Sequence, residues 1–227
     1  MIIGGNSRIG VLGGIGPEAT AEFYSRLIKR LQERGFIKSN TDFPQILINS
    51  IPAPELIHED ISEQELEPYI RGLKELDKFK VDFIVMVCNT IHLYYDRLQK
   101  EIKTPIIDLR HEIKQALKKK GIRYVLILGT ASTIKQGLYR FRDIKSFEPS
   151  KKEIKQLTDA IFNFNTGLHK ELQTQKVLKI CKKYQIEGAE SIILGCTEFA
   201  VMLKSKHISK IDTIDILIEA AISRCLL

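Results

Sequence analysis

The chain has 227 residues, of which 44% are hydrophobic and 28% are charged, a composition typical of a soluble globular protein. No apolar run approaches the roughly 20 residues that a membrane-spanning helix needs, and the start of the chain lacks the basic flank of a signal peptide, so we expect a cytoplasmic protein. The net charge of +7 comes from 35 basic and 28 acidic residues that are intermixed, which favours a solvated surface over a nucleic-acid-binding patch.

Short apolar runs alternate with amphipathic stretches along the whole chain, a pattern that predicts βαβ units and an α/β fold with mostly parallel sheets. The expected strands are Ile9–Gly13, Gln45–Asn49, Asp82–Val87, Ile106–Asp108, Tyr124–Leu128, Ser191–Gly195 and Thr213–Ile216. The expected helices are Glu18–Arg34, Gln64–Phe79, Leu109–Lys120, Ser150–Lys170 and Thr174–Tyr184.

The chain contains an internal repeat. The run DFIVMVCNT, which contains Cys88, resembles the run ESIILGCTE, which contains Cys196. Each cysteine follows an expected strand, and a second short expected strand with an acidic residue, Asp108 or Asp215, comes 20 or 19 residues later. The repeat predicts two similar α/β halves, each of which places a thiol at the end of a strand.

This placement of the two thiols favours one kind of chemistry. Ligands of open parallel sheets bind beyond the carboxyl ends of the strands, so two thiols facing each other across a pseudo-twofold axis would flank one bound molecule. A racemase removes a proton from one face of a carbon and supplies one to the other face. We therefore expect Cys88 and Cys196 to act as the catalytic acid and base, whose roles exchange for the mirror substrate.

Polar residues near the strand ends are the candidates for binding the substrate, because hydroxyl and amide groups can stabilise charge that develops on a carboxylate. Glu198 can contact the substrate amino group or start the helix that follows it. The full set of expected substrate-binding residues is Asn49, Asn89, Thr90, Thr130, Ser132, Thr133, Thr197 and Glu198.

The cysteine spacing and the glycine-rich run near the N-terminus do not favour a metal site or a nucleotide site. The four cysteines are too far apart for a CxxC metal site, so we expect no metal, and we expect Cys181 and Cys225 to be packing residues. The run GIGPEA from Gly14 fits the dinucleotide pattern formally, but Pro17 removes an N–H donor from the turn. His92 is left open between tuning the Cys88 thiol and a structural hydrogen bond.

Four segments resemble the aspartate/glutamate racemase family, in its aspartate racemase branch: IGVLGGIGPEAT from Ile9, CNTIH from Cys88, GTASTI from Gly129 and GCTE from Gly195. The resemblance implies two pseudo-symmetric three-layer α/β domains with the active site in the cleft between them. It also implies an amino-acid substrate, no cofactor and a homodimer. We expect residues 1–104 and 209–227 to form the first domain and residues 105–208 the second.

The chain departs from the family pattern where side-chain specificity is set. The resemblance implies an arginine after the second strand, yet no Lys or Arg occurs from Ser39 to Ile70, and Asn165 stands where a lysine is expected. An acidic substrate would need such cations, so a neutral or differently charged amino acid is as good a candidate as aspartate. A related thiol isomerase or racemase of another small carboxylate, and a non-catalytic amino-acid-binding homologue, are the alternatives.

Overall fold

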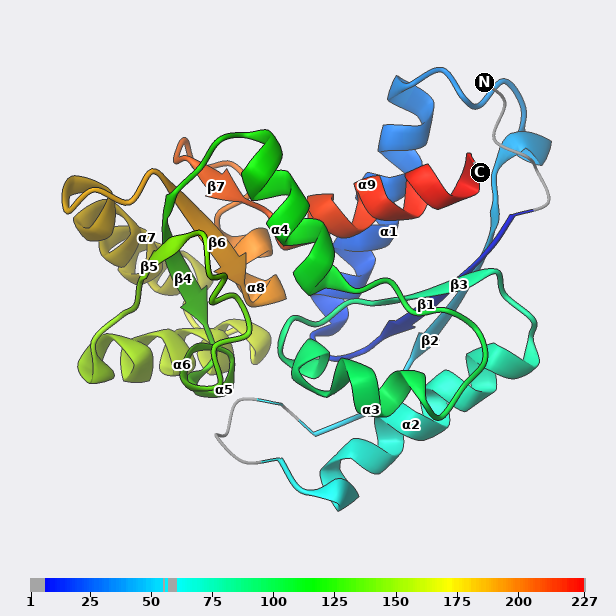
Figure 1. Ribbon diagram of the computed structural model, residues 1–227, viewed down its shortest axis with the longest axis horizontal. Helices are drawn as coiled ribbons and strands as arrows, with labels where there is room; N and C mark the ends of the chain where they lie inside the picture. Colours follow the sequence, from blue (N-terminus) through cyan, green and yellow to red (C-terminus); the bar gives the residue numbers. More distant parts are fainter. Residues whose placement is uncertain (1–6, 55, 57–60, 227) are drawn as a thin grey trace.

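The structure, a computed structural model, describes residues 7–54, 56 and 61–226 (Figure 1). It is an α/β protein with two parallel sheets of three and four strands, as the alternation of apolar runs and amphipathic stretches predicts. Within the described residues, no helix is both long and apolar enough to cross a bilayer.

The first sheet contains β1 (Arg8–Gly13), β2 (Gln45–Ser50) and β3 (Phe83–Met86) in the order β2-β1-β3, and both pairings are parallel. A single parallel bridge between Ile84 and Ile106 extends this sheet beyond β3. The helical segments before the second sheet are α1 (Pro17–Glu33), η1 (Asn40–Asp42), α2 (Glu63–Lys78), η2 (Thr90–Tyr94), α3 (Tyr95–Gln99) and α4 (Leu109–Lys119).

The second sheet has the order β5-β4-β6-β7 and is likewise parallel. Its strands are β4 (Tyr124–Gly129), β5 (Lys145–Phe147), β6 (Ser191–Gly195) and β7 (Lys210–Ile211). Its helices, followed by the last helix of the chain, are α5 (Ala131–Lys135), α6 (Lys151–Asn165), α7 (Lys170–Ile186), α8 (Thr197–Met202) and α9 (Thr213–Cys225). In both sheets the first strand of the half lies between its second and third strands, and a short fourth segment pairs beyond the third. The repeat in the sequence is therefore also a repeat of topology.

The two sheets share an apolar core. Successive side chains of a strand point to opposite faces, and in β1 Val11 and Leu12 accordingly belong to two different buried clusters. The cluster around Leu12 lies against α2, whereas the cluster around Val11 continues through α1, α4 and α9 into the second sheet. This continuous core holds the strand ends of the two sheets in a fixed relation.

The expected strand Thr213–Ile216 is wrong, because these residues form the first turn of α9. The Asp212 carboxylate accepts hydrogen bonds from the backbone N–H groups of Ile214 and Asp215, which is the geometry of a helix N-cap. Asp108 caps α4 in the same way. Asp212, and not Asp215, is therefore the structural counterpart of Asp108 in the repeat.

The chain crosses between the sheets at points that differ from the expected domain boundaries. Lys210–Ile211, expected in the first domain, forms β7 at the edge of the second sheet. Ile106, expected in the second domain, bridges to β3 of the first sheet. Helix α9, drawn red in Figure 1, then lies against α1 and α4.

The expected helix Ser150–Lys170 ends five residues early, and the helix expected at Thr174–Tyr184 begins four residues early. Gly167 and His169 have positive φ angles of 80° and 47°, a left-handed conformation that ends a helix. Helix α6 therefore ends at Asn165, and α7 begins at Lys170. The break matters for function because it leaves the end of α6 beside the pocket that contains the two strand-end cysteines.

Candidate active site

Both strand-end cysteines line one pocket of about 230 Å³. Cys88 follows β3, and Cys196 directly follows β6 at the N-cap position of α8. Both thiols are buried, with 7% of each residue exposed. The pocket therefore lies beyond the carboxyl ends of strands from both sheets, where ligands of parallel sheets bind.

The loop after β1 forms one wall of the pocket and needs its glycines. Gly16 has φ +89°, and a Cβ atom there would lie 2.7 Å from Oε1 of Glu198. The Gly14 N–H donates to the Thr20 hydroxyl at 3.0 Å, which closes the turn onto α1. A pyrophosphate held by this loop would face the Glu198 carboxylate, so the electrostatics disfavour the dinucleotide interpretation of GIGPEA.

Glu198 is the polar centre of the pocket. Its carboxylate accepts hydrogen bonds from Cys196 Sγ at 2.8 Å, from Asn165 Nδ2 at 3.0 Å and from Thr197 Oγ1 at 3.3 Å. Only 7% of Glu198 is exposed. The carboxylate thus joins the Cys196 thiol, which follows the second sheet, to the end of α6 and stands close to the glycine loop of the first sheet.

The two thiols are held protonated when no ligand is bound. The pKa of Cys88 is raised to about 12, mainly by burial; the charge of Glu198 contributes to this rise, and the backbone N–H groups of Ile91 and Thr90 oppose it. Burial, followed by the charge and hydrogen bond of Glu198, also raises the pKa of Cys196 well above its ordinary value. A cation bound beside Glu198 would offset the carboxylate charge and make either thiolate easier to form.

Three threonine hydroxyls from both halves of the chain meet at the floor of the pocket. Thr90 Oγ1 lies 3.1 Å from the hydroxyl oxygens of Thr130 and Thr133, and Thr130 donates to Thr133 at 3.1 Å. Thr90 and Thr130 line the pocket, whereas Thr133 is fully buried behind them. This cluster therefore presents the Thr90 and Thr130 hydroxyl groups to the pocket.

The structure does not bring every expected binding residue to the pocket surface. The Asn89 amide is engaged elsewhere: its oxygen accepts from the Tyr139 hydroxyl, and its nitrogen donates to Thr213 at 3.0 Å. Asn89 therefore braces the Cys88 segment against α9. Ser132 is buried and does not line the pocket.

Asn49 lies on a different surface of the protein. In the parallel register it is opposite Leu12, whose side chain packs toward α2. The Asn49 amide donates to the Gly72 carbonyl at 3.1 Å and to Glu75 Oε2 at 2.7 Å, both on α2. Its expected contact with substrate is thus not part of this geometry.

The remaining candidates from the sequence are packing residues in the structure. His92 is fully buried, and burial lowers its pKa to about 4 against the opposing charge of Asp108, so the ring is neutral. Cys181 and Cys225 are buried away from the pocket. Among the residues that the structure describes, no three His, Cys, Asp or Glu side chains are grouped to hold a metal ion.

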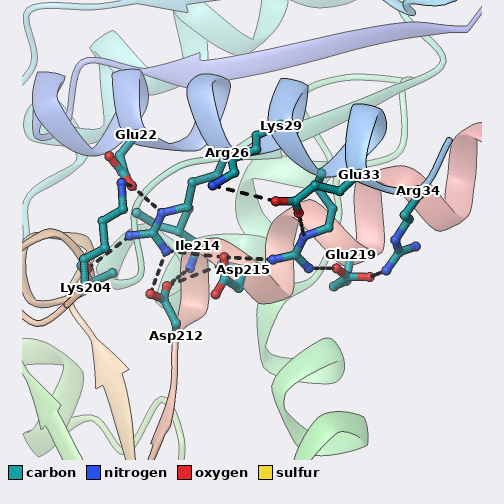
Figure 2. A network of polar contacts seen from close by, with 12 residues as sticks. Glu22, Arg26, Lys29, Glu33, Arg34, Lys204, Asp212, Ile214, Asp215 and Glu219 are labelled. Carbon is teal, nitrogen blue, oxygen red and sulfur yellow. Dashed lines mark hydrogen bonds and ion pairs between the residues drawn. The ribbon is translucent and has the colours of Figure 1, made fainter. Parts of the chain in front are cut away.

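A partly buried polar network holds α8, which begins directly after Cys196 (Figure 2). Arg26 of α1 donates to Asp212 Oδ2 at 2.7 Å, to Asp215 Oδ1 at 3.3 Å and to the Ala200 carbonyl of α8 at 3.2 Å. The Arg26 side chain is 12% exposed and that of Asp212 is 7% exposed. One arginine thus ties the first helix of the chain to the helices that begin after β6 and β7.

The fold and the site define an α/β protein in which two buried thiols from equivalent strand ends lie in one pocket. The family described as Asp/Glu/hydantoin racemase matches residues 12–221. The chain belongs to this family, as an amino-acid racemase.

Individual relatives agree with the family match. The chain is 29% identical over 217 residues to the broad specificity amino-acid racemase RacX of Bacillus subtilis (strain 168), which covers 91% of this chain and 92% of that protein. Among solved structures, an aspartate racemase homologue from Pyrococcus horikoshii OT3 has a TM-score of 0.76 and 25% identity, covering 97% of this chain and 100% of that chain. The aspartate racemase of Picrophilus torridus has a TM-score of 0.82 and 23% identity, covering 97% and 94%.

Proposed function

We propose that this protein interconverts the enantiomers of an α-amino acid by proton transfer at Cα, with Cys88 and Cys196 as the two bases. One observation carries the proposal: the two thiols reach a single pocket from equivalent strand ends of the two sheets. A substrate held between them presents one face of Cα to each sulfur, which is what a two-base mechanism requires.

The groups around the thiols supply the binding contacts of the mechanism. The substrate carboxylate binds at the hydroxyl groups of Thr90 and Thr130, which stabilise the charge that develops after Cα loses its proton. The substrate ammonium binds beside Glu198. Because that carboxylate raises the pKa of both thiols, pairing it with the ammonium makes the base easier to form when substrate is present.

Proton transfer requires one cysteine as thiolate and the other as protonated thiol. One thiolate takes the Cα proton, and the opposite thiol gives its proton to the other face, so the pair exchanges roles with each inversion. Cys196 Sγ donates to Glu198 at 2.8 Å, so the carboxylate that pairs with the substrate ammonium also orients this thiol in the pocket.

The test is exchange of the Cα proton in D₂O, followed by NMR, over a panel of L- and D-amino acids. The wild type should exchange and invert at least one of them. Cys88→Ala and Cys196→Ala should each abolish inversion and leave exchange absent or confined to one enantiomer. Cys181→Ala, which removes a buried thiol outside the pocket, is the matched control and should keep inversion. Binding without any exchange would favour the non-catalytic homologue instead.

The homodimer is a prediction from the family resemblance, and the cytoplasmic location is a prediction from the sequence. We propose a homodimer in the cytoplasm. Light scattering after size exclusion would give twice the 26.0 kDa mass of one chain, and a mass equal to that of one chain would contradict the dimer.

A further inference from the structure

The walls of the pocket are unlike a site for an acidic side chain. Among the described lining residues, Glu198 is the one that carries a charge, and none is Lys or Arg. The apolar part of the lining comes from three segments of the chain. The loop after β1 contributes Ile15 and Pro17, the segment after β2 contributes Ala53 and Leu56, and helix α6 contributes Ile161.

Two basic residues of the second half of the chain, Lys170 and Arg140, are engaged outside the pocket. Lys170, which follows α6 closely, pairs with Glu18 and lies with its ammonium 4.6 Å from the centre of the Phe164 ring. Arg140 pairs with Glu148 at 2.6 Å. Neither lines the pocket, so neither neutralises a second carboxylate on the substrate.

The charges of the pocket are accounted for by the amino-acid headgroup alone. Its ammonium takes Glu198, and its carboxylate takes the Thr90 and Thr130 hydroxyls. Among the described lining residues, a side-chain carboxylate would find no cation and a side-chain ammonium would find no second acid, so against this lining either would be buried unpaired at high cost.

The end of α6 strengthens this conclusion. Ile161 and Asn165 are four residues apart, so both lie on one face of the helix, and both line the pocket. Asn165 donates to Glu198 at 3.0 Å and so helps to orient the carboxylate, while Ile161 contributes an alkyl surface. At about 230 Å³ the pocket is also smaller than the roughly 300–1,000 Å³ that is usual for drug-sized ligands, which suits one free amino acid.

From this lining we infer that the substrate is an α-amino acid with an uncharged, apolar side chain, which packs against Ala53, Leu56 and Ile161. The inference rests on the proposed racemase function and assigns its substrate class. It separates this pocket from one built for aspartate or glutamate, although the chain belongs to the family named after them.

The deciding experiment compares three substrates with side chains of the same branching. L-Leucine is apolar, L-asparagine is neutral and polar, and L-aspartate is charged, so differences in kcat/KM report polarity more than shape. For the wild type we expect kcat/KM for leucine to exceed that for aspartate by roughly tenfold or more. L-Lysine in the same panel tests a basic side chain and should also fall below leucine.

A pair of variants tests whether the missing cation is the cause. Ala53 lies in a partly exposed loop, so Ala53→Lys adds an ammonium to the apolar wall, and Ala53→Met adds a chain of similar length without charge. We expect Ala53→Lys to raise the ratio of aspartate to leucine kcat/KM by roughly tenfold, while Ala53→Met leaves the ratio near that of the wild type. Circular dichroism confirms that both variants are folded.

The outcomes distinguish this inference from the function on which it rests. If the wild type exchanges the Cα proton of aspartate or lysine as well as that of leucine, or better, the substrate class is wrong while the racemase proposal stands. If no amino acid in the panel exchanges, both fall. An equal effect of Ala53→Lys and Ala53→Met would show that charge at this wall does not set the preference, and would also overturn the inference.

Discussion

Glu198 is the residue through which binding and proton transfer are coupled, because its carboxylate contacts Cys196 and raises the pKa of both thiols. Glu198→Gln keeps the shape and removes the charge. We expect kcat/KM to fall roughly tenfold to a hundredfold, since a hydrogen bond to a charged group contributes about 1.5–3 kcal/mol. The rising limb of the pH–rate profile should move to lower pH, because both thiol pKa values drop when the carboxylate charge is lost.

The shift in the pH profile separates this role from a merely structural one. Glu187→Gln changes an exposed carboxylate at the end of α7 and should leave both kcat/KM and the pH profile unchanged. A Glu198→Gln enzyme with reduced activity but an unmoved pH profile would mean that the carboxylate does not act on the thiols.

Residues whose roles are local could be predicted from the sequence. Cys88, Cys196, Thr90 and Thr130 each follow an apolar strand, and the carboxyl ends of parallel strands meet at one edge of a sheet. Asn49 also ends a strand, but its orientation depends on the register with β1, which sends the side chain to α2. Strand-end position alone does not distinguish these two cases.

At the scale of elements, the Arg26 network joins α1 to α8 and α9 (Figure 2). Arg26→Met removes the partner of a buried carboxylate, Asp212, and breaking such a pair typically costs about 3–5 kcal/mol. Asp212 keeps its contacts with the N–H groups of α9, so we expect a loss of about 3 kcal/mol in the free energy of unfolding, measured by urea denaturation.

Arg34→Met on the same helix face is the matched control. Arg34 pairs with Glu219, but both side chains are 36% exposed, and exposed pairs contribute about 0–1 kcal/mol. Equal losses for Arg26→Met and Arg34→Met would show that burial does not give the Arg26 network its importance.

Helices and strands could be predicted where the apolar residues recur with a clear period. The prediction was weaker where a capping residue determines whether a segment begins a helix. The expected strand at Thr213 has the apolar, β-branched composition of a strand, yet one side chain, that of Asp212, starts a helix there. The apolar wall from Ile161 was not foreseen, because it depends on how the end of α6 packs across the pocket. The left-handed Gly167, which ends α6 early, was the available signal.

At the scale of the whole molecule, the buried thiols predict that stability declines in alkali. Cys181 is fully buried in the shared core, and burial raises its pKa from an ordinary 9.0 to about 12. Above pH 9 the unfolded chain loses this proton while the folded protein keeps it. The protonated thiol therefore contributes fully to stability below pH 9, and the contribution is lost as pH rises toward 12.

The measurement is urea unfolding of the wild type and Cys181→Ala at pH 9, 10 and 11. The substitution carries its own cost at every pH, but only the wild type has this ionisation, so its free energy of unfolding should fall more steeply, by about 1 kcal/mol per pH unit. Cys225, whose pKa burial raises only to about 11, should give the same difference over a narrower range when replaced by alanine. Parallel pH curves for wild type and Cys181→Ala would mean that the folded core lets this thiol ionise near its ordinary pKa, and that the core shared by the two sheets is more open than its packing indicates.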